Sequence, residues 1–64
     1  PIVRPPSPKQ MRYLADVARV ASMYDEASRN VGYSDKSRLL CLEMASNLIA
    51  LTTKLLHPDA PQID

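Results

Sequence analysis

The fold is decided by residues 35–56, which read DKSRLLCLEMASNLIALTTKLL. Apolar residues repeat along this stretch with spacings of three and four, which is the period of an α-helix. The Cys41 row consists of Cys41, Met44, Leu48, Leu51 and Leu55. The Leu42 row consists of Leu42, Ala45, Ile49, Thr52 and Leu56, with one polar member. At about 100° per residue the rows lie side by side and, with Leu40, cover roughly 200° of the helix surface. A helix this apolar needs two neighbours, and the chain supplies only one.

A second helical pattern covers residues 8–31. Ser7 is a typical N-cap, Pro8 suits the first helical position, and Gln10 completes a Ser-x-x-Gln capping box. An apolar row then runs through Tyr13, Val17, Val20, Tyr24, Ala27 and Val31, with Leu14 and Ala21 beside it. We expect this row to pack against the second helix.

The connection between the two helices is short. Gly32, the single glycine of the chain, follows the last apolar position, where a left-handed residue often closes a helix. Ser34 is the next N-cap, with Asp35 in the first turn. Because so short a link makes neighbouring helices antiparallel, the sequence predicts an all-α, two-helix antiparallel hairpin.

The predicted hairpin spans residues 8–57, with helices at about 8–31 and 35–56. Residues 1–7 hold three of the six prolines, so we expect an extended, proline-rich arm there. Residues 58–64 have two further prolines and no apolar pattern, and we expect a flexible tail.

The size of the chain favours self-association. A protein of 64 residues buries little of its surface and is marginally stable alone. One cysteine and one histidine supply neither an internal disulfide nor the four ligands of a structural zinc site. We therefore expect two hairpins to dimerise into a four-helix bundle. The Cys41 row is the predicted dimer interface, and Leu42, Ala45, Ile49 and Leu56 are assigned to the contact with the first helix.

The sequence predicts no catalytic, cofactor-binding or metal-binding residues. Cys41 lies on an apolar row with no base nearby, which is typical of a small core residue. His57 ends the second helix, where the helix dipole favours a cation. A single glycine cannot form a phosphate-cradling loop, and two aliphatic helices leave little room for a polar pocket. We expect a protein that is not an enzyme and has no small-molecule substrate.

Our main functional interpretation is a small interaction or regulatory protein that acts as a homodimer and binds another protein. The predicted partner contacts are apolar residues outside the rows and arginines on the outer side of the first helix: Arg12, Arg19, Met23 and Leu39. No apolar stretch approaches the ~18 residues of a membrane span, so we expect no membrane partner. A lone cysteine suits a reducing compartment, which favours an intracellular, cytoplasmic location.

Two alternatives stay open. A helical-bundle dimer can lie along double-stranded RNA or DNA and contact its phosphates, here through Lys9, Arg12, Arg19, Lys36 and Lys54. In shape alone, such a dimer resembles small viral suppressors of RNA silencing, although no specific motif carries this likeness. The net charge of only +1 counts against it. The second alternative is an oligomerisation module of a longer protein.

Overall fold

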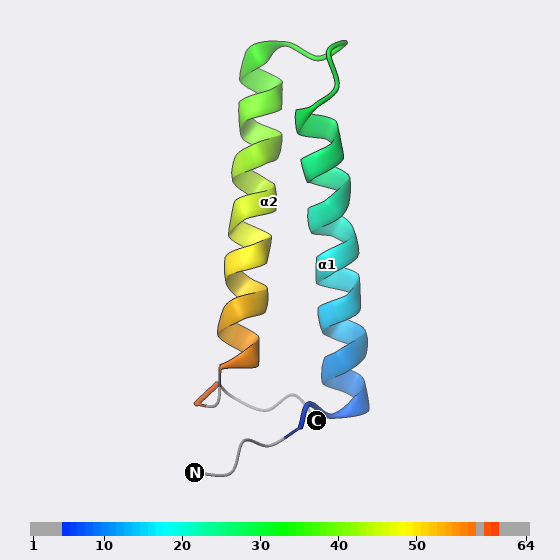
Figure 1. Cartoon of the computed structure of the whole chain (residues 1–64), viewed down its shortest axis with the longest axis vertical. Helices are drawn as coiled ribbons and strands as arrows, with labels where there is room; N and C mark the ends of the chain where they lie inside the picture. Colours follow the sequence, from blue (N-terminus) through cyan, green and yellow to red (C-terminus); the bar gives the residue numbers. More distant parts are fainter. Residues whose placement is uncertain (1–4, 58, 61–64) are drawn as a thin grey trace.

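The computed structural model describes residues 5–57 and 59–60. It consists of two antiparallel helices, α1 (Pro8–Ser28) and α2 (Asp35–Leu56), joined by a turn at residues 29–34 (Figure 1). The described residues contain no strand, so the predicted all-α hairpin is confirmed. The expectations for residues 1–4, 58 and 61–64 lie outside the described part of the chain.

Both helices begin at the serines whose side chains can cap them. Ser7 Oγ accepts a hydrogen bond from the backbone N–H of Gln10 at 3.1 Å, and Pro8 occupies the first helical position. Ser34 Oγ accepts from the backbone N–H of Ser37 at 3.2 Å. Each cap satisfies one of the backbone donors that a helix start leaves without an intrahelical partner.

The end of α1 differs from the prediction, because the helix stops at Ser28 and not near Val31. The next two backbone N–H groups, of Arg29 and Asn30, bond three residues back and tighten the last turn. Asn30 Oδ1 then accepts from the N–H of Gly32 at 2.9 Å, a local side-chain bond that favours a turn over a helix. No described residue has a positive φ, so the expected left-handed glycine at Gly32 is wrong.

The contact between the helices is narrow and rich in small or polar side chains. On α1 the buried residues are Gln10, Leu14, Val17 and Ala21. On α2 only Ala45 is buried. The half-buried residues of this helix are Arg38, Cys41, Leu48, Leu51, Thr52 and Leu55. Thr52 Oγ1 donates to the Leu48 carbonyl at 3.0 Å, so this hydroxyl is satisfied within its own helix.

Two expectations about the packing are wrong. Tyr13, Val20 and Val31 lie outside the contact, and Val31 is 88% exposed in the turn. On α2, Leu42, Ile49 and Leu56 are exposed and only Ala45 of that predicted set faces α1. The physical reason is that α1 docks on the boundary between the two apolar rows of α2. Ala21 and Ala45 are the most deeply buried residues there, while Leu42, Ile49 and Leu56 are left exposed on one side and Met44 on the other.

Candidate interaction surfaces

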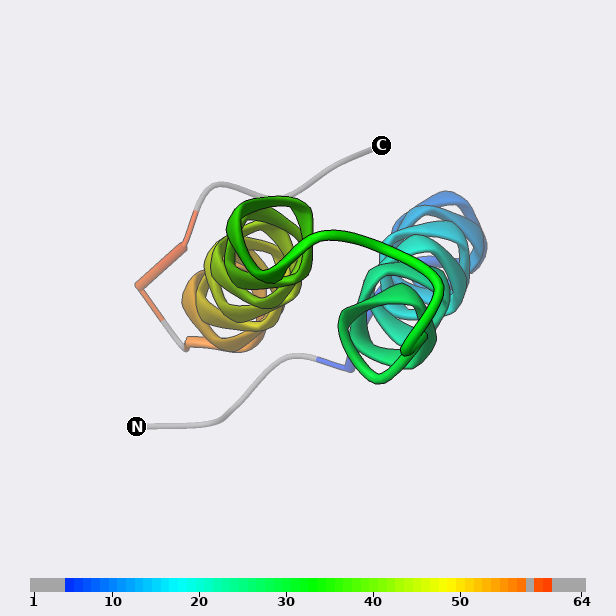
Figure 2. The same cartoon turned by 90° about the horizontal axis from the view of Figure 1, so that it is seen from above.

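The hairpin is a single layer of two helices, open on both broad sides. Viewed along the helices, the described part of the chain places no third helix or sheet over either side (Figure 2). Its principal extents are 47 × 18 × 13 Å, and its radius of gyration of 14.4 Å exceeds the roughly 10.7 Å of a compact domain of this length. Stable domains usually bury apolar surface between two or more layers, and here one layer stands alone.

The distribution of hydrophobic residues is inverted relative to an ordinary small domain. Among the described residues, the buried hydrophobic ones are Leu14, Val17, Ala21 and Ala45. Twelve large hydrophobic side chains are exposed there, and eight of them belong to the open sides of the two helices rather than to the turn or edges. Those eight are Met11, Tyr13, Val20, Leu40, Leu42, Met44, Ile49 and Leu56. Exposed apolar side chains in this number make the open sides candidate interaction surfaces.

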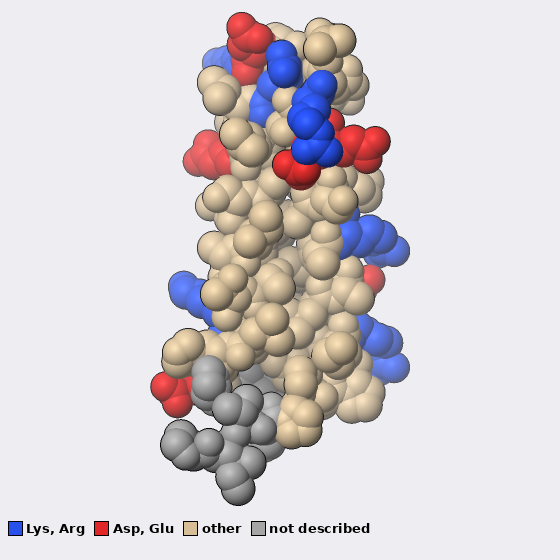
Figure 3. All heavy atoms as spheres, viewed as in Figure 1, with Lys and Arg blue, Asp and Glu red and all other residues tan. Residues whose placement is uncertain are grey.

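The first open side is the Ile49 face. Helix geometry places on it the α1 residues Met11, Ala15, Ala18 and Ser22 with the α2 residues Leu42, Ile49 and Leu56. Leu42, Leu56 and Ile49 are 50%, 53% and 58% exposed. Large side chains thus line α2, and between Met11 and Asp25 only small ones line α1. Figure 3 shows a broad side of the hairpin with an uncharged band along both helices and charged side chains at the turn end and outer edges.

The opposite side is the Tyr13 face. It comprises the α1 residues Tyr13, Val20 and Tyr24 with the α2 residues Leu40, Met44 and Leu51. Here both helices carry large side chains, which shield one another. Val20, Tyr13 and Met44 are accordingly only 37%, 44% and 44% exposed, while Leu40, near the turn, is 54% exposed. Tyrosine also tolerates partial exposure, because its hydroxyl can remain in water.

Two side chains link the helices at opposite ends of the hairpin. Gln10, in the first turn of α1, donates from Nε2 to the carbonyl of Leu55 in the last turn of α2 at 3.0 Å. Arg38, in the first turn of α2, donates from Nε to the carbonyl of Ser28 at the end of α1, also at 3.0 Å. Each bond satisfies a carbonyl at a helix C-terminus, and the Arg38 cation is favoured there by the helix dipole.

These links were only partly visible in the sequence. Gln10 matched a capping-box position, which gave no sign that its amide would also reach the other helix. Nothing local in the sequence indicates that Arg38 reaches the end of α1. Its guanidinium also lies 3.8 Å from Asp35, one turn away on its own helix. Asp25 pairs with Arg29 along α1.

The charged side chains otherwise lie on the outer edges. Arg19 pairs with Asp16 at 3.2 Å, and both side chains are largely exposed. Lys9 and Arg12 share the outer side of α1 with that pair, while Lys36 and Lys54 share the outer side of α2. No ion pair of these four cations occurs among the described residues. Exposed pairs such as Arg19–Asp16 contribute about 0–1 kcal/mol to stability.

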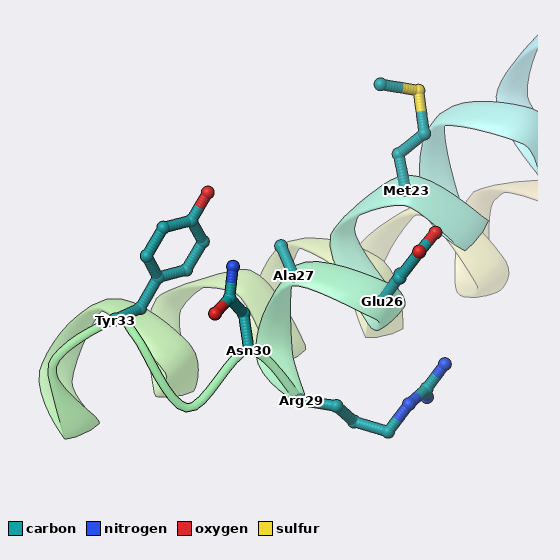
Figure 4. Close-up of a pocket in the computed structure, with 6 residues that line it drawn as sticks. All are labelled: Met23, Glu26, Ala27, Arg29, Asn30 and Tyr33. Carbon is teal, nitrogen blue, oxygen red and sulfur yellow. The ribbon is translucent and has the colours of Figure 1, made fainter.

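An open hollow of about 530 Å³ lies at the turn end of α1. Its lining consists of Met23, Glu26, Ala27, Arg29, Asn30 and Tyr33. Figure 4 shows the Met23 and Tyr33 side chains rising on either side of Ala27 and Asn30, while Arg29 points away from them. The hollow combines a flexible thioether and an aromatic ring, both of which suit contact with another protein.

The predicted site residues fall into different environments. In the Cys41 row, Met44 is exposed, whereas Cys41, Leu48, Leu51 and Leu55 are half-buried. The row is therefore shared between the contact with α1 and the Tyr13 face, and its role in a dimer stays a prediction. Met23 and Leu39 are both well exposed and lie near the outer edges.

The described residues contain no group of three or more His, Cys, Asp or Glu that could hold a metal ion. The free thiol of Cys41 is half-buried in the helix contact. His57 ends α2, where its Nδ1 accepts from the backbone N–H of Asp59 at 3.2 Å. The His57 ring is thus held by a bond within a local turn.

By length and composition, α2 could cross a membrane. An 18-residue window within it has a mean hydropathy of 1.4, and only 6% of that window is buried in the hairpin. The expectation of no membrane partner was based on unbroken apolar runs, which overlooks a helix with scattered polar residues. The finding shows above all how little of this apolar helix the chain itself covers.

No family model, no curated protein and no solved structure matches the chain. The interpretation of its surfaces accordingly depends on their own geometry and chemistry.

Proposed function

We propose that this protein is a non-enzymatic interaction protein that acts as a homodimeric helical bundle and binds another protein. The observation that carries the proposal is the inverted distribution of hydrophobic residues, with four buried and twelve large ones exposed. A lone hairpin gains little from burying two alanines, a valine and a leucine. Its folding free energy has to come largely from whatever covers its open sides.

The exposed area agrees in size with a protein interface. The chain exposes 5197 Å², whereas a compact protein of 7.1 kDa exposes roughly 4,100 Å². A partner would have to bury at most this difference of about 1,100 Å² to bring the exposed area of the chain down to that of a compact protein. One side of a standard protein interface buries about 800 Å².

Two open faces suit two kinds of contact. A dimer through one broad face makes a four-helix bundle, and it leaves the opposite face uncovered. We assign that second face to the other protein, together with Met23 at its edge. An interaction protein with no catalytic group then acts by occlusion or by bridging.

The charges of α1 favour a protein cover over a lipid one. The hairpin holds α1 beside α2 from the Gln10–Leu55 link to the Ser28–Arg38 link. The charged residues spread along α1 are Lys9, Arg12, Asp16, Arg19, Asp25 and Glu26. Each charge at the centre of a bilayer costs about 2.5–3.5 kcal/mol or more, so α2 cannot enter lipid with its hairpin partner intact.

Nucleic-acid binding is the second candidate, and one observation favours it. Lys9, Arg12, Lys36 and Lys54 form no ion pair within the described residues and lie on outer edges that a helical-bundle dimer would leave accessible. A titration of duplex RNA and duplex DNA at several salt concentrations tests it. Micromolar affinity with a steep salt dependence would favour this function over the main proposal.

Sedimentation equilibrium over a wide range of protein concentration tests the homodimer. The proposal predicts a species of twice the 7.1 kDa chain mass at micromolar concentration. A well-folded monomer at that concentration would overturn it.

Affinity capture from native cells tests the second partner. The bait is the wild-type protein beside Met23→Asp, with Lys54→Asp as a charge-changing control on the outer edge of the other helix. A protein captured by wild type and control but lost with Met23→Asp, and then bound stoichiometrically in purified form, is the expected result. Capture that does not respond to Met23→Asp would remove this residue from the site.

A further inference from the structure

We infer that the second copy packs on the Ile49 face, with the two-fold axis running along the helices, so that α2 of each chain lies on α1 of the other. The inference rests on the proposed homodimer and adds to it the face, the orientation and the register. It places the dimer on the Leu42 row, and not on the predicted Cys41 row.

The shape of the Ile49 face is self-complementary. Leu42, Ile49 and Leu56 form a ridge of large side chains on α2, and Ala15, Ala18 and Ser22 form a trough of small ones on α1. A symmetric dimer brings the same face of both chains together, so each residue meets a different residue of the partner. On such a face, the large side chains of each chain's α2 can pack against the small side chains of the partner's α1, so the same contact forms twice in the dimer.

This complementarity selects one of two possible two-fold axes. An axis perpendicular to the helices would set ridge on ridge and trough on trough, which leaves clashes along one helix pair and voids along the other. An axis along the helices sets Leu42 and Ile49 in the partner's trough, with Leu56 beside the partner's Met11. It also makes every neighbouring pair of helices antiparallel, as in up-down four-helix bundles.

The register follows from the two links at the hairpin ends. Gln10 meets Leu55 and Ser28 meets Arg38, so facing residues have numbers that sum to 65 or 66. An axis along the helices keeps these levels between chains. Ile49 then lies at the level of residues 16–17, between the partner's Ala15 and Ala18, and Leu42 lies beside the partner's Ser22.

The positions of the charged residues at the turn end agree with the same register. On the Ile49 face, α1 ends with Asp25 and Arg29, and α2 begins with Asp35 and Arg38. The proposed dimer sets Arg29 near the level of the partner's Asp35, and Asp25 within one turn of the partner's Arg38. Opposite charges therefore come within about one turn of each other across the interface, whereas a perpendicular axis would set Asp35 and Arg38 against the apolar end of the partner's α2.

The Tyr13 face is less suited to the second copy. Both of its helices carry large side chains, so it has no trough, and its residues already shield one another. The Ile49 face has three aliphatic side chains that are 50–58% exposed, whereas on the Tyr13 face only Leu40, at 54%, is comparably exposed. Burying aliphatic surface without hydroxyls gives the larger hydrophobic gain per side chain.

Disulfide trapping between two differently labelled chains tests the inference. Both chains carry Cys41→Ser, which removes the native thiol, and one adds Ala18→Cys while the other adds Ile49→Cys. Because each chain then has one cysteine, only an interchain disulfide can form, and it needs Cβ atoms about 3.5–4.5 Å apart. Oxidation of the mixture with diamide should give a covalent dimer with one chain of each kind, and neither chain alone should crosslink.

A matched pair on the other face makes the failures distinguishable. Val20→Cys mixed with Met44→Cys, at the same level of the hairpin, should not crosslink. If this pair crosslinks and the Ala18→Cys and Ile49→Cys pair does not, the homodimer stands but its face is wrong. A disulfide between two copies of Ser46→Cys, near the middle of α2, would show the perpendicular axis and also overturn the inference.

A second test does not depend on oxidation. Ala18→Leu fills the trough and should convert the dimer to monomer in sedimentation, whereas Val20→Leu on the Tyr13 face should leave it dimeric. Retained dimer with Ala18→Leu contradicts the inference. If wild type is itself a monomer in the same experiment, the proposed function fails and not merely its geometry.

Discussion

The contact between the two helices and the Ile49 face divide the hydrophobic residues of this chain unequally. The contact is built around Ala21 and Ala45, with the polar groups of Gln10 and Thr52 inside or beside it. The Ile49 face carries Leu42, Ile49 and Leu56, which the hairpin leaves about half exposed. A chain that puts small residues inside and large ones outside is shaped to be covered. In the proposed dimer, the intrachain contact sets the geometry of the hairpin, and association supplies most of its stability.

The substitution with the largest expected effect on this difference between the two regions is Ile49→Ala. If a second copy covers Ile49, truncation should cost about 2–5 kcal/mol in each chain, which is counted twice in the dimer. If the residue stays exposed as in the lone hairpin, the cost should be within about 0.5 kcal/mol. Urea unfolding followed by circular dichroism measures the difference. A small cost would contradict the proposal that a second copy covers this face. Lys54→Ala, on the outer side of α2, is the surface control.

Leu14→Ala tests the intrachain contact in the same way. Leu14 is among the few buried hydrophobic side chains, so we expect a loss of about 2–5 kcal/mol of unfolding free energy. Its effect should be smaller per dimer than that of Ile49→Ala, because neighbouring alanines give it fewer contacts to lose. A larger effect for Leu14 than for Ile49 would reverse our ranking of the two regions.

The helix caps should contribute less than either apolar region. Ser34→Ala removes the acceptor of the Ser37 N–H bond and should cost about 1 kcal/mol. Ser34→Asp, which restores an acceptor, should recover most of that loss. A thermal unfolding series of the three proteins tests this. Equal melting temperatures for wild type and Ser34→Ala would show that the cap adds nothing.

The link at the open end of the hairpin should matter about as much as one hydrogen bond. Gln10→Met keeps the length of the side chain and removes its bond to the Leu55 carbonyl, so we expect a loss of about 0.5–1.5 kcal/mol. Amide hydrogen exchange should show the last turn of α2 opening more often. Unchanged protection there would exclude a stabilising role for this bond.

We expect the smallest change in stability from a substitution on the outer edge of α1. Asp16→Asn breaks the exposed pair with Arg19, and its expected effect on stability is about 0–1 kcal/mol in low salt and less in high salt. The same change makes the outer side of α1 more basic. It should therefore strengthen duplex RNA or DNA binding if the second candidate function holds, and leave binding absent if it does not.

Local features of the hairpin could be predicted from the sequence, and the relative rotation of its helices could not. Ser7 and Ser34 identify the two helix starts because a cap depends on residues within one turn. The end of α1 was missed because the Asn30 side chain competes for the backbone near Gly32. Gln10 was recognised only as a cap partner, since nothing local reveals a bond to a residue 45 positions away.

The rotation of α1 about α2 was missed for a different reason. An apolar arc of roughly 200° fits a neighbouring helix equally well at many angles, so periodicity alone does not select one. Side-chain size decides, because the most deeply buried residues of the two helices are the small Ala21 and Ala45. The width of the arc, by contrast, was informative from the start, and it predicted that something beyond α1 has to cover α2.

The most direct test of the central claim is urea unfolding of the wild-type protein at two concentrations that differ a hundredfold. If folding and dimerisation are coupled, the apparent stability should rise by about 2.7 kcal/mol at the higher concentration, and the midpoint should move to higher urea. A midpoint that does not depend on protein concentration would mean that the hairpin is stable alone, which would contradict the account.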